Sequence, residues 1–365
     1  MKSEARNPKS ERNPKPKART PDFTPHASRV TNHESRITQY PPMKSLLTLS
    51  AALLALAAPA ADLRLGIIGT DTSHVVAFTK LFNDAADKDH LPGARVVVAF
   101  KGGSPDNAAS AKYVNVYAEQ IRTNHGVRLV ESIPALCEQV DAVLLLSVDG
   151  RPHLEQVRPV MAAKKPVFID KPMAGSLRDV VEIFRLAKDA GVPVFSASAL
   201  RFASNTVAAR AGAIGTITNA LTTGPCEIEP HHPDLFWYGV HGTEALFTLL
   251  GPGCETVQRR QTPAGKIEVT GTWRGGAKGT FREDPKFGGS AEGSRGAMPV
   301  GNFDGYVPLA REILKFFQTG VSPVPPQETV EIFAFMEAAD ASKREDGRPV
   351  AISNLLHQAG WPLTR

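Results

Sequence analysis

The side chain best placed for chemistry in this sequence is a lysine with a proline directly after it. Asp170, Lys171 and Pro172 follow an apolar stretch, residues 166–169, that is typical of a buried strand. Ligands bind at the carboxyl ends of strands in open α/β sheets. Proline restricts the backbone on both sides of it, and the Lys171–Pro172 bond is a candidate for the cis form. We therefore expect the Lys171 ammonium to be a positioned cation that contacts a ligand. The alternative is a lysine that only faces solvent.

A second candidate is His241, which lies shortly after three aromatic residues, Phe236, Trp237 and Tyr238. Imidazole titrates near neutral pH, so His241 suits proton transfer. The alternative is a histidine packed inside a helix. The aromatic side chains could stack on a sugar ring, although such residues more often belong to the core.

Three imidazoles and two carboxylates gather within fourteen positions. They are His231, His232, Asp234, His241 and Glu244. Such side chains suit zinc or manganese, and a metal could activate water for hydrolysis. The spacing matches no strong metal motif, and Pro233 interrupts any helix there. We therefore assign no metal ligands and keep a metal-assisted hydrolase or lyase as an alternative.

The turn after the first predicted strand is the expected place for a dinucleotide, and its glycine pattern is incomplete. The dinucleotide fingerprint uses three glycines, for the tight turn, for the approach of the pyrophosphate and for helix packing. This chain keeps only the first of them, in the run Gly69-Thr70-Asp71-Thr72-Ser73-His74. A carboxylate at Asp71 would oppose a pyrophosphate by about 1 kcal/mol even when well solvated. The free N–H groups at the start of the next helix would attract a pyrophosphate. Alternatively, Asp71 or Thr72 could simply cap that helix.

The end of the second predicted strand gives a weak indication of the type of dinucleotide. No acidic residue follows this strand to hold a ribose hydroxyl. Lys101 and Ser104 follow this strand instead, and they could bind a 2′-phosphate. The sequence thus leans slightly toward NADP without excluding NAD.

The apolar pattern predicts how these residues are positioned. Up to residue 198, strands are expected at 63–68, 95–100, 129–130, 142–147 and 166–169, alternating with helices at 73–83, 108–120 and through Cys137. This alternation indicates an α/β doubly wound parallel sheet of the Rossmann type. Later runs rich in Gly and Thr, at 220–223, 267–273 and 279–282, indicate an antiparallel sheet. Helices at 235–250, 306–319 and 328–343 would cover one of its faces.

These motifs resemble those of the Gfo/Idh/MocA oxidoreductases, such as glucose–fructose oxidoreductase and inositol dehydrogenase. The resemblance covers about residues 63–350. It rests on LRLGIIG (63–69), DAVLLLSVDGRPH (141–153), KKPVFIDKP (164–172, with Asp170 in place of the family's Glu), Arg201-Phe202 and WYGVHGTEALFTLLG (237–251). It implies a Rossmann-type nucleotide-binding domain (62–198), an α+β substrate and oligomerisation domain with a mostly antiparallel open sheet (199–350), and a C-terminal tail (351–365).

The resemblance also implies an activity. The chain would be an NAD(P)-dependent oxidoreductase that transfers hydride to or from a sugar, polyol or sugar-derived carbonyl. Lys171 would contact substrate and nicotinamide, and His241 would exchange the hydroxyl proton. The family usually carries an aspartate four residues before this histidine, where this chain has Trp237, so Asp234 or Glu244 would have to supply a carboxylate.

The implied site residues fall into two groups. The substrate-binding residues would be Asp170, Arg201, Asp234, Trp237 and Glu244. The residues binding NAD or NADP would be Gly69, Thr70, Asp71, Thr72, Ser73, His74, Lys101, Ser147, His153 and Lys171.

The charge of the chain is concentrated in its first 42 residues. The 365 residues carry 42 Lys and Arg against 37 Asp and Glu, a net charge of +5. Residues 1–42 hold nine of the basic side chains and four of the acidic ones, so the remaining chain is balanced. The basic character therefore gives no support to a nucleic-acid partner. Residues 1–42 are expected to be a disordered or mis-annotated leader, because they are rich in proline and poor in apolar residues.

Residues 43–61 have the layout of a signal peptide. Met43-Lys44 precedes an apolar run, LLTLSAALLALA, and Ala58-Pro59-Ala60 offers small residues for cleavage. The run is shorter than the roughly 20 residues that span a bilayer, so no permanent membrane span is expected. We expect cleavage after residue 60 or 61 and a periplasmic or secreted protein, with a cytoplasmic one as the alternative.

The same sequence leaves two other classes of function open. Nicotinamide nucleotides belong to the cytoplasm, so an exported protein must either retain its cofactor or work without one. A hydrolase or lyase, and a non-catalytic carbohydrate-binding protein, therefore remain alternatives. Three cysteines make a disulfide framework implausible. A homodimer or homotetramer is expected through the open sheet, as in the family.

Overall fold

The computed structural model describes residues 61–362. The proposed leader, and the proposed signal peptide up to residue 60, lie outside these residues. The elements of the first half are β1 (Leu63–Ile68), α1 (Ser73–Asn83), β2 (Ala94–Phe100), α2 (Ala108–His125), β3 (Arg128–Val130), α3 (Ile133–Cys137), β4 (Ala142–Leu145), α4 (His153–Ala162), β5 (Val167–Ile169), α5 (Leu177–Ala190) and β6 (Val194–Ser196). Those of the second half are a 3-10 helix (Ala199–Phe202), α6 (Ser204–Arg210), β7 (Ile217–Gly224), α7 (Val240–Leu250), β8 (Cys254–Gln261), β9 (Ile267–Trp273), β10 (Lys278–Glu283), β11 (Gly288–Gly293), β12 (Gly296–Pro299), α8 (Val307–Thr319), α9 (Pro326–Arg344), β13 (Val350–Ala351) and α10 (Ile352–Gln358).

The first sheet has six parallel strands in the order β3-β2-β1-β4-β5-β6. Alternate residues along each strand point to opposite faces. Helices α3, α4 and α5 pack on one face, and α1 packs on the other with the end of α2. This arrangement confirms the predicted doubly wound fold. It also brings the carboxyl ends of β1, β4 and β5 together at one edge of the sheet.

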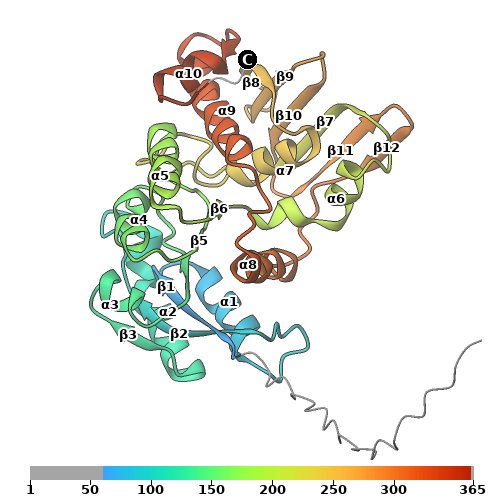
Figure 1. The fold of residues 1–365 in the computed structure, drawn as a ribbon. Coiled ribbons are helices and arrows are strands. Elements are labelled where there is room, and N and C mark those ends of the chain that lie inside the picture. The colour runs from blue at the N-terminus through green and yellow to red at the C-terminus, as the bar shows by residue number, and fades with distance from the viewer. Residues whose placement is uncertain (1–60, 363–365) are drawn as a thin grey trace, which may run out of the picture. The chain divides into compact units, whose positions relative to one another are not determined.

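The second sheet has seven strands in the order β12-β11-β7-β10-β9-β8-β13. Its pairs are antiparallel except β7 with β10, which run parallel. Helices α7 and α9 cover one face, and Figure 1 shows both of them against this sheet. The prediction of a mostly antiparallel sheet with helices on one side is confirmed for α7 and α9. It is wrong for the predicted helix 306–319, which packs on the first sheet instead.

Helix α8 belongs to the first sheet, although it follows the second sheet along the chain. Its buried residues Leu309, Ile313 and Phe316 share one apolar cluster with Phe168 of β5 and Phe195 of β6. The ring centroids of Phe195 and Phe316 are 4.8 Å apart. The first sheet is therefore completed by a segment more than 100 residues beyond its last strand.

Two general features of residues 61–362 bear on the predictions. No helix in this part of the chain is both long and apolar enough to cross a membrane. Cys137, Cys226 and Cys254 are all buried and none of them is in a disulfide.

Candidate active site

The carboxyl ends of the first sheet open into a cleft of about 410 Å³. One wall is formed by the β1–α1 turn, the β5 end and the β6 end. The other wall is formed by the segment before α7, the start of α7 and the loops that follow β10 and β12. Lys171 and His241 both line this cleft, as do Trp237 and Tyr238. The two side chains that the sequence singled out for chemistry therefore share one cavity.

Lys171 reaches the cleft from the end of β5. The Lys171–Pro172 peptide bond is cis, as the sequence allowed. The Lys171 Nζ lies 5.2 Å from the centroid of the Tyr238 ring, a cation–π distance. Burial lowers the pKa of Lys171, and the carboxylates of Asp170 and Glu227 only partly offset this effect.

His241 lies in the first turn of α7. Its Nδ1 is 2.7 Å from the Ser198 Oγ, at the end of β6. Its ring is held between Tyr238 and Phe287, with centroids at 5.2 and 5.5 Å. Burial lowers the pKa of His241 well below its usual value, and the charges of Lys171 and His74 lower it further. His241 is therefore neutral at neutral pH and free to accept a proton.

The β1–α1 turn presents the amino end of α1 to the cleft. Thr72 is the N-cap of α1, and Asp71, Thr72, Ser73 and His74 all line the cavity. The Asp71 carboxylate points into the protein, where it accepts hydrogen bonds from the Val148 N–H at 2.9 Å and from a serine hydroxyl of α2. Because Asp71 is only 1 % exposed, its charge is directed away from the open side of the turn.

His74 and Asp170 form a buried pair beside Lys171. The His74 Nδ1 is 2.5 Å from the Asp170 Oδ2, and the pair joins the first turn of α1 to the end of β5. Burial raises the pKa of Asp170, but His74 and Lys171 outweigh it and leave this pKa below its usual value. The sequence placed these residues in separate groups, and the structure brings them into contact.

Several predicted cofactor residues support the cleft without lining it. Gly69 has φ of +86°, and a Cβ there would lie 2.4 Å from the backbone of Ser147, so only glycine fits this turn. The Thr70 hydroxyl donates to a backbone carbonyl of α2 at 2.7 Å. Both ring nitrogens of His153 lie near backbone carbonyls, those of Met173 and Ser147. The Lys101 ammonium instead donates a 3.2 Å hydrogen bond to the Asn115 side chain.

Three predicted substrate residues lie away from the cleft, in ion pairs that join elements of the second domain. Arg201 is buried and donates to Glu244 and to Glu328, each at 2.6 Å. The Asp234 carboxylate pairs with Arg259 at 2.6 Å. Neither Asp234 nor Glu244 therefore lines the cavity as a replacement for the carboxylate missing at Trp237.

The structure supplies a carboxylate that the sequence did not single out. Glu227, in the loop after β7, lines the cleft. Its negative charge acts to raise the pKa of Lys171 against the effect of burial. Ser198, Phe287 and Tyr306 also line it and were missed. These residues lie in loops or at the ends of elements, so no periodic pattern marks them. The SAS motif after β6 and the tyrosine before α8 are the only local signals.

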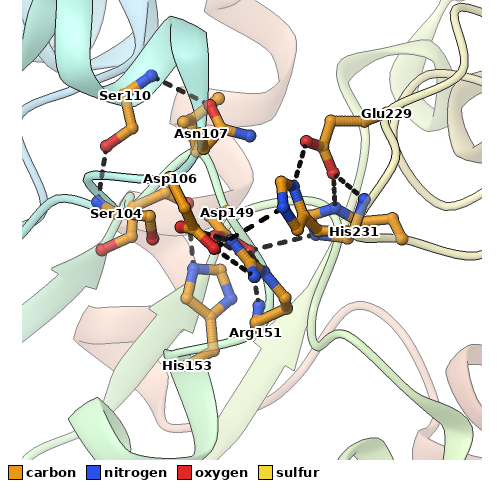
Figure 2. Close-up of polar contacts among 12 residues, drawn as sticks. Ser104, Asp106, Asn107, Ser110, Asp149, Arg151, His153, Glu229 and His231 are labelled. Carbon is orange, nitrogen blue, oxygen red and sulfur yellow. Dashed lines mark hydrogen bonds and ion pairs between the residues drawn. The ribbon is translucent and has the colours of Figure 1, made fainter.

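A chain of alternating charges joins the two domains beside the cleft. Arg151 pairs with Asp106 at 2.8 Å and with Asp149 at 2.7 Å, and Figure 2 shows this arginine between the two carboxylates. The His232 Nε2 lies 3.1 Å from Asp149, and the His232 Nδ1 lies 2.7 Å from Glu229. The charge chain thus links the β2–α2 and β4–α4 loops to the loop before α7.

The histidines and carboxylates considered for a metal are dispersed among these contacts. His231 and His232 pair with Glu229, Asp234 with Arg259, and His241 lies in the cleft. Within residues 61–362, no group of three or more histidine, cysteine or carboxylate side chains is arranged to hold a metal ion. The geometry gives no support to the metal-assisted alternative.

The residues around the amino end of α1 fit a dinucleotide. The N–H groups of the first turn of a helix attract phosphate. Here that turn lines the cleft, and Gly69 keeps the preceding backbone tight against Ser147. The Asp71 carboxylate, which would oppose a pyrophosphate, is turned inward and accepts two hydrogen bonds there. Thr72 and Ser73 would face the pyrophosphate, and Lys171 would face the nicotinamide end.

Comparison with known proteins gives matches in family and fold. Residues 63–198 match a family model described as an oxidoreductase family with an NAD-binding Rossmann fold. No curated protein matches the sequence.

This chain matches several solved structures over nearly the whole length of those structures. An apo scyllo-inositol dehydrogenase from Lactobacillus casei has a TM-score of 0.64 at 12% identity, covering 80% of this chain and 98% of that one. An oxidoreductase from Agrobacterium radiobacter, in complex with NAD+, L-tartaric acid and magnesium, has a TM-score of 0.62 at 16% identity, covering 81% and 100%. An oxidoreductase from Thermotoga maritima has a TM-score of 0.61 at 19% identity, covering 81% and 100%.

Proposed function

We propose that this chain is a member of the Gfo/Idh/MocA oxidoreductases, whose family model with an NAD-binding Rossmann fold matches residues 63–198, and that it oxidises or reduces a sugar, polyol or sugar-derived carbonyl. The observation that carries this proposal is the shared cleft. The Lys171 ammonium, the His241 imidazole and the amino end of α1 all face one cavity at the carboxyl edge of the parallel sheet.

Lys171 and His241 have complementary roles in this proposal. A bound NAD or NADP supplies the hydride acceptor or donor. Lys171 donates a hydrogen bond to the oxygen on the reacting carbon and stabilises negative charge there. His241, neutral because its pKa is lowered by burial and by Lys171, takes the hydroxyl proton in oxidation and returns it in reduction.

The rest of the lining favours a polyhydroxylated substrate. Trp237, Tyr238 and Phe287 offer aromatic faces, which stack well on the apolar faces of sugar rings. Glu227 supplies a carboxylate that can accept hydrogen bonds from vicinal hydroxyls. The scyllo-inositol dehydrogenase among the similar folds is consistent with this class.

Two measurements test the proposal. Native mass spectrometry of the purified protein should show a mass increment equal to NAD or NADP, either retained or taken up on addition. A panel of inositols, alditols and aldoses with NAD+ or NADP+ should then give absorbance at 340 nm. Neither a bound dinucleotide nor any turnover would contradict the proposal and favour a non-catalytic binding protein.

We also propose that the protein is exported through residues 43–61 and assembles as a homodimer or homotetramer. Export requires that the cofactor be kept through turnover, because the surroundings would not supply it. The amino-terminal sequence of protein recovered from the periplasm or medium should start near Ala61. Recovery of residues 1–42 in abundance from cells would contradict the proposal that the signal peptide begins the protein at Met43, and with it the export proposal.

A further inference from the structure

Two departures from the expected motifs meet each other in the cleft. His74 occupies the position of the third fingerprint glycine, and Asp170 stands where the family motif has Glu. The two residues are 96 positions apart in the chain, yet the His74 Nδ1 and the Asp170 Oδ2 are 2.5 Å apart. Each unusual residue is therefore the contact partner of the other.

The surroundings fix the orientation of the His74 ring. The other Asp170 oxygen accepts the backbone N–H of Lys171 at 2.8 Å, which holds the carboxylate in place. The His74 ring packs against Tyr306, with centroids 4.7 Å apart, and against Phe78 at 5.6 Å. An ionised carboxylate accepts the proton of Nδ1, so the lone pair of this imidazole is on Nε2.

His74 is one of the residues that line the reaction cleft, and Nε2 is the ring nitrogen that does not contact Asp170. His74 lines the cavity with Lys171 and His241, while its Nδ1 side is turned to the buried Asp170. Within residues 61–362 the only hydrogen-bonding partner of the His74 ring is that carboxylate. Among these residues, Nε2 is therefore left as an acceptor without a partner.

A purely structural role accounts poorly for this pair. Burying a polar pair that includes a carboxylate costs desolvation energy, which the attraction within the pair often fails to recover. Apolar residues of similar size are frequently as stabilising. The position occupied by His74 requires only a small residue in the dinucleotide fingerprint. A dyad kept at this site is better explained by chemistry than by packing.

We propose that His74, oriented by Asp170, is a second acid–base residue of the active site and the group that finally holds the substrate proton. This inference rests on the proposed oxidoreductase function. During oxidation the hydroxyl proton leaves to His241 and passes, through a water or a neighbouring substrate hydroxyl, to the His74 Nε2. The electron pair of the O–H bond becomes the second bond of the carbonyl, and hydride leaves the carbon for the oxidised nicotinamide dinucleotide. Reduction reverses each of these transfers.

A second proton acceptor is useful because His241 holds a proton poorly. The pKa of His241 is lowered by burial and by Lys171. The Asp170 carboxylate holds the His74 ring through Nδ1 and leaves Nε2 as the nitrogen that can take the proton passed on from His241.

The decisive variant is His74→Gly, which restores the small residue of the fingerprint while removing the base. Turnover of the best substrate of the panel should fall about 100-fold, the usual scale for loss of an acid–base group, with KM for the dinucleotide unchanged or lower. Free imidazole in the buffer should restore a measurable part of the rate. His74→Asn, which can still donate to Asp170, should lose turnover to a similar extent and guards against a folding defect of the glycine variant.

The outcomes separate this inference from the proposed function. His90→Gly, in a loop outside the cleft, is the matched control and should neither slow turnover nor respond to imidazole. Unchanged turnover in both His74 variants would overturn the inference while leaving the oxidoreductase function intact. A loss that imidazole does not rescue, with an unchanged pH profile, would overturn it in favour of a structural role. A wild-type protein that turns over no member of the panel would instead remove the proposed function itself, and the dyad's role with it.

Discussion

At the scale of single residues, the chemistry of the cleft depends on one lysine, two histidines and one carboxylate that lie close together. The Lys171 charge lowers the pKa of His241, and Asp170 contacts His74 while lying next to Lys171 in the chain. A change at Lys171 therefore alters the protonation of His241. The pH dependence of turnover is therefore the most informative property of this site.

Replacement of Lys171 by methionine tests this interplay. Turnover should fall by about 100-fold or more, because one preorganised donor to the reacting oxygen is lost. Loss of the neighbouring positive charge should raise the pKa of His241, so the acid limb of the oxidation profile should move to higher pH. The melting temperature should stay equal or rise, since a partly buried cation is removed.

Lys188→Met is the control for this prediction, because Lys188 is exposed on α5. A large fall in melting temperature with normal turnover of Lys171→Met would show that Lys171 is structural. An acid limb that stays in place would contradict its electrostatic effect on His241.

The sequence predicted the site at this scale only where a local motif exists. Lys171 is marked by the proline after it, and His241 by the segment that resembles a known family. Glu227 and Ser198 carry no such mark, because their place depends on how loops fold over the first sheet. Arg201 and Glu244 have side chains that could bind a substrate, but both are buried and form an ion pair with each other.

At the scale of elements, most boundaries followed from periodic patterns. Strands β1 and β9 and helix α1 agree with the predicted bounds, since each alternation or amphipathic repeat is complete. Strands β11 and β12 were missed because they are short and rich in glycine. The packing of α8 on the first sheet was also not predictable from its own amphipathic pattern, which does not specify a partner.

The charge chain beside the cleft gives a prediction about pH and stability. Burial lowers the pKa of His232, but its contacts with Asp149 and Glu229 outweigh burial and raise it. A group whose pKa is raised by folding stabilises the fold below its unfolded pKa, about 6.5 for histidine, and loses this contribution as pH rises through the folded value. Stabilisation by His232 should therefore be present at pH 5.5 and absent well above neutral pH.

Urea unfolding of His232→Gln measures this effect. The variant should be less stable than wild type by about 1–3 kcal/mol at pH 5.5, the scale of hydrogen bonds to charged groups. At pH 9 the difference should be much smaller. His231→Gln is the neighbouring control, since its pair with Glu229 is more exposed and should contribute little. A difference that is constant with pH would show that His232 acts by packing alone.

At the scale of the whole molecule, helices α7 and α9 cover one face of the second sheet, and within residues 61–362 its other face is left open. The residues that alternate outward along its central strands include Glu268, Thr270 and Thr280, and the hydroxyls of the two threonines are 3.0 Å apart. A surface of this regularity suits an isologous contact with a second copy, in which each residue faces its symmetry-related counterparts. Neither the number of copies nor their contact could be obtained from periodicity, which describes a single chain.

Thr270→Arg tests this surface directly. Sedimentation of the wild-type protein at micromolar concentration should give a dimer or tetramer. The variant should shift toward monomer, because arginines brought together across a two-fold axis repel each other and their desolvation is costly. Thr123→Arg, on the exposed side of α2, adds the same charge elsewhere and should leave the assembly unchanged. A monomeric wild-type protein would contradict the assembly, and an unaffected Thr270→Arg oligomer would show that the copies meet through another surface.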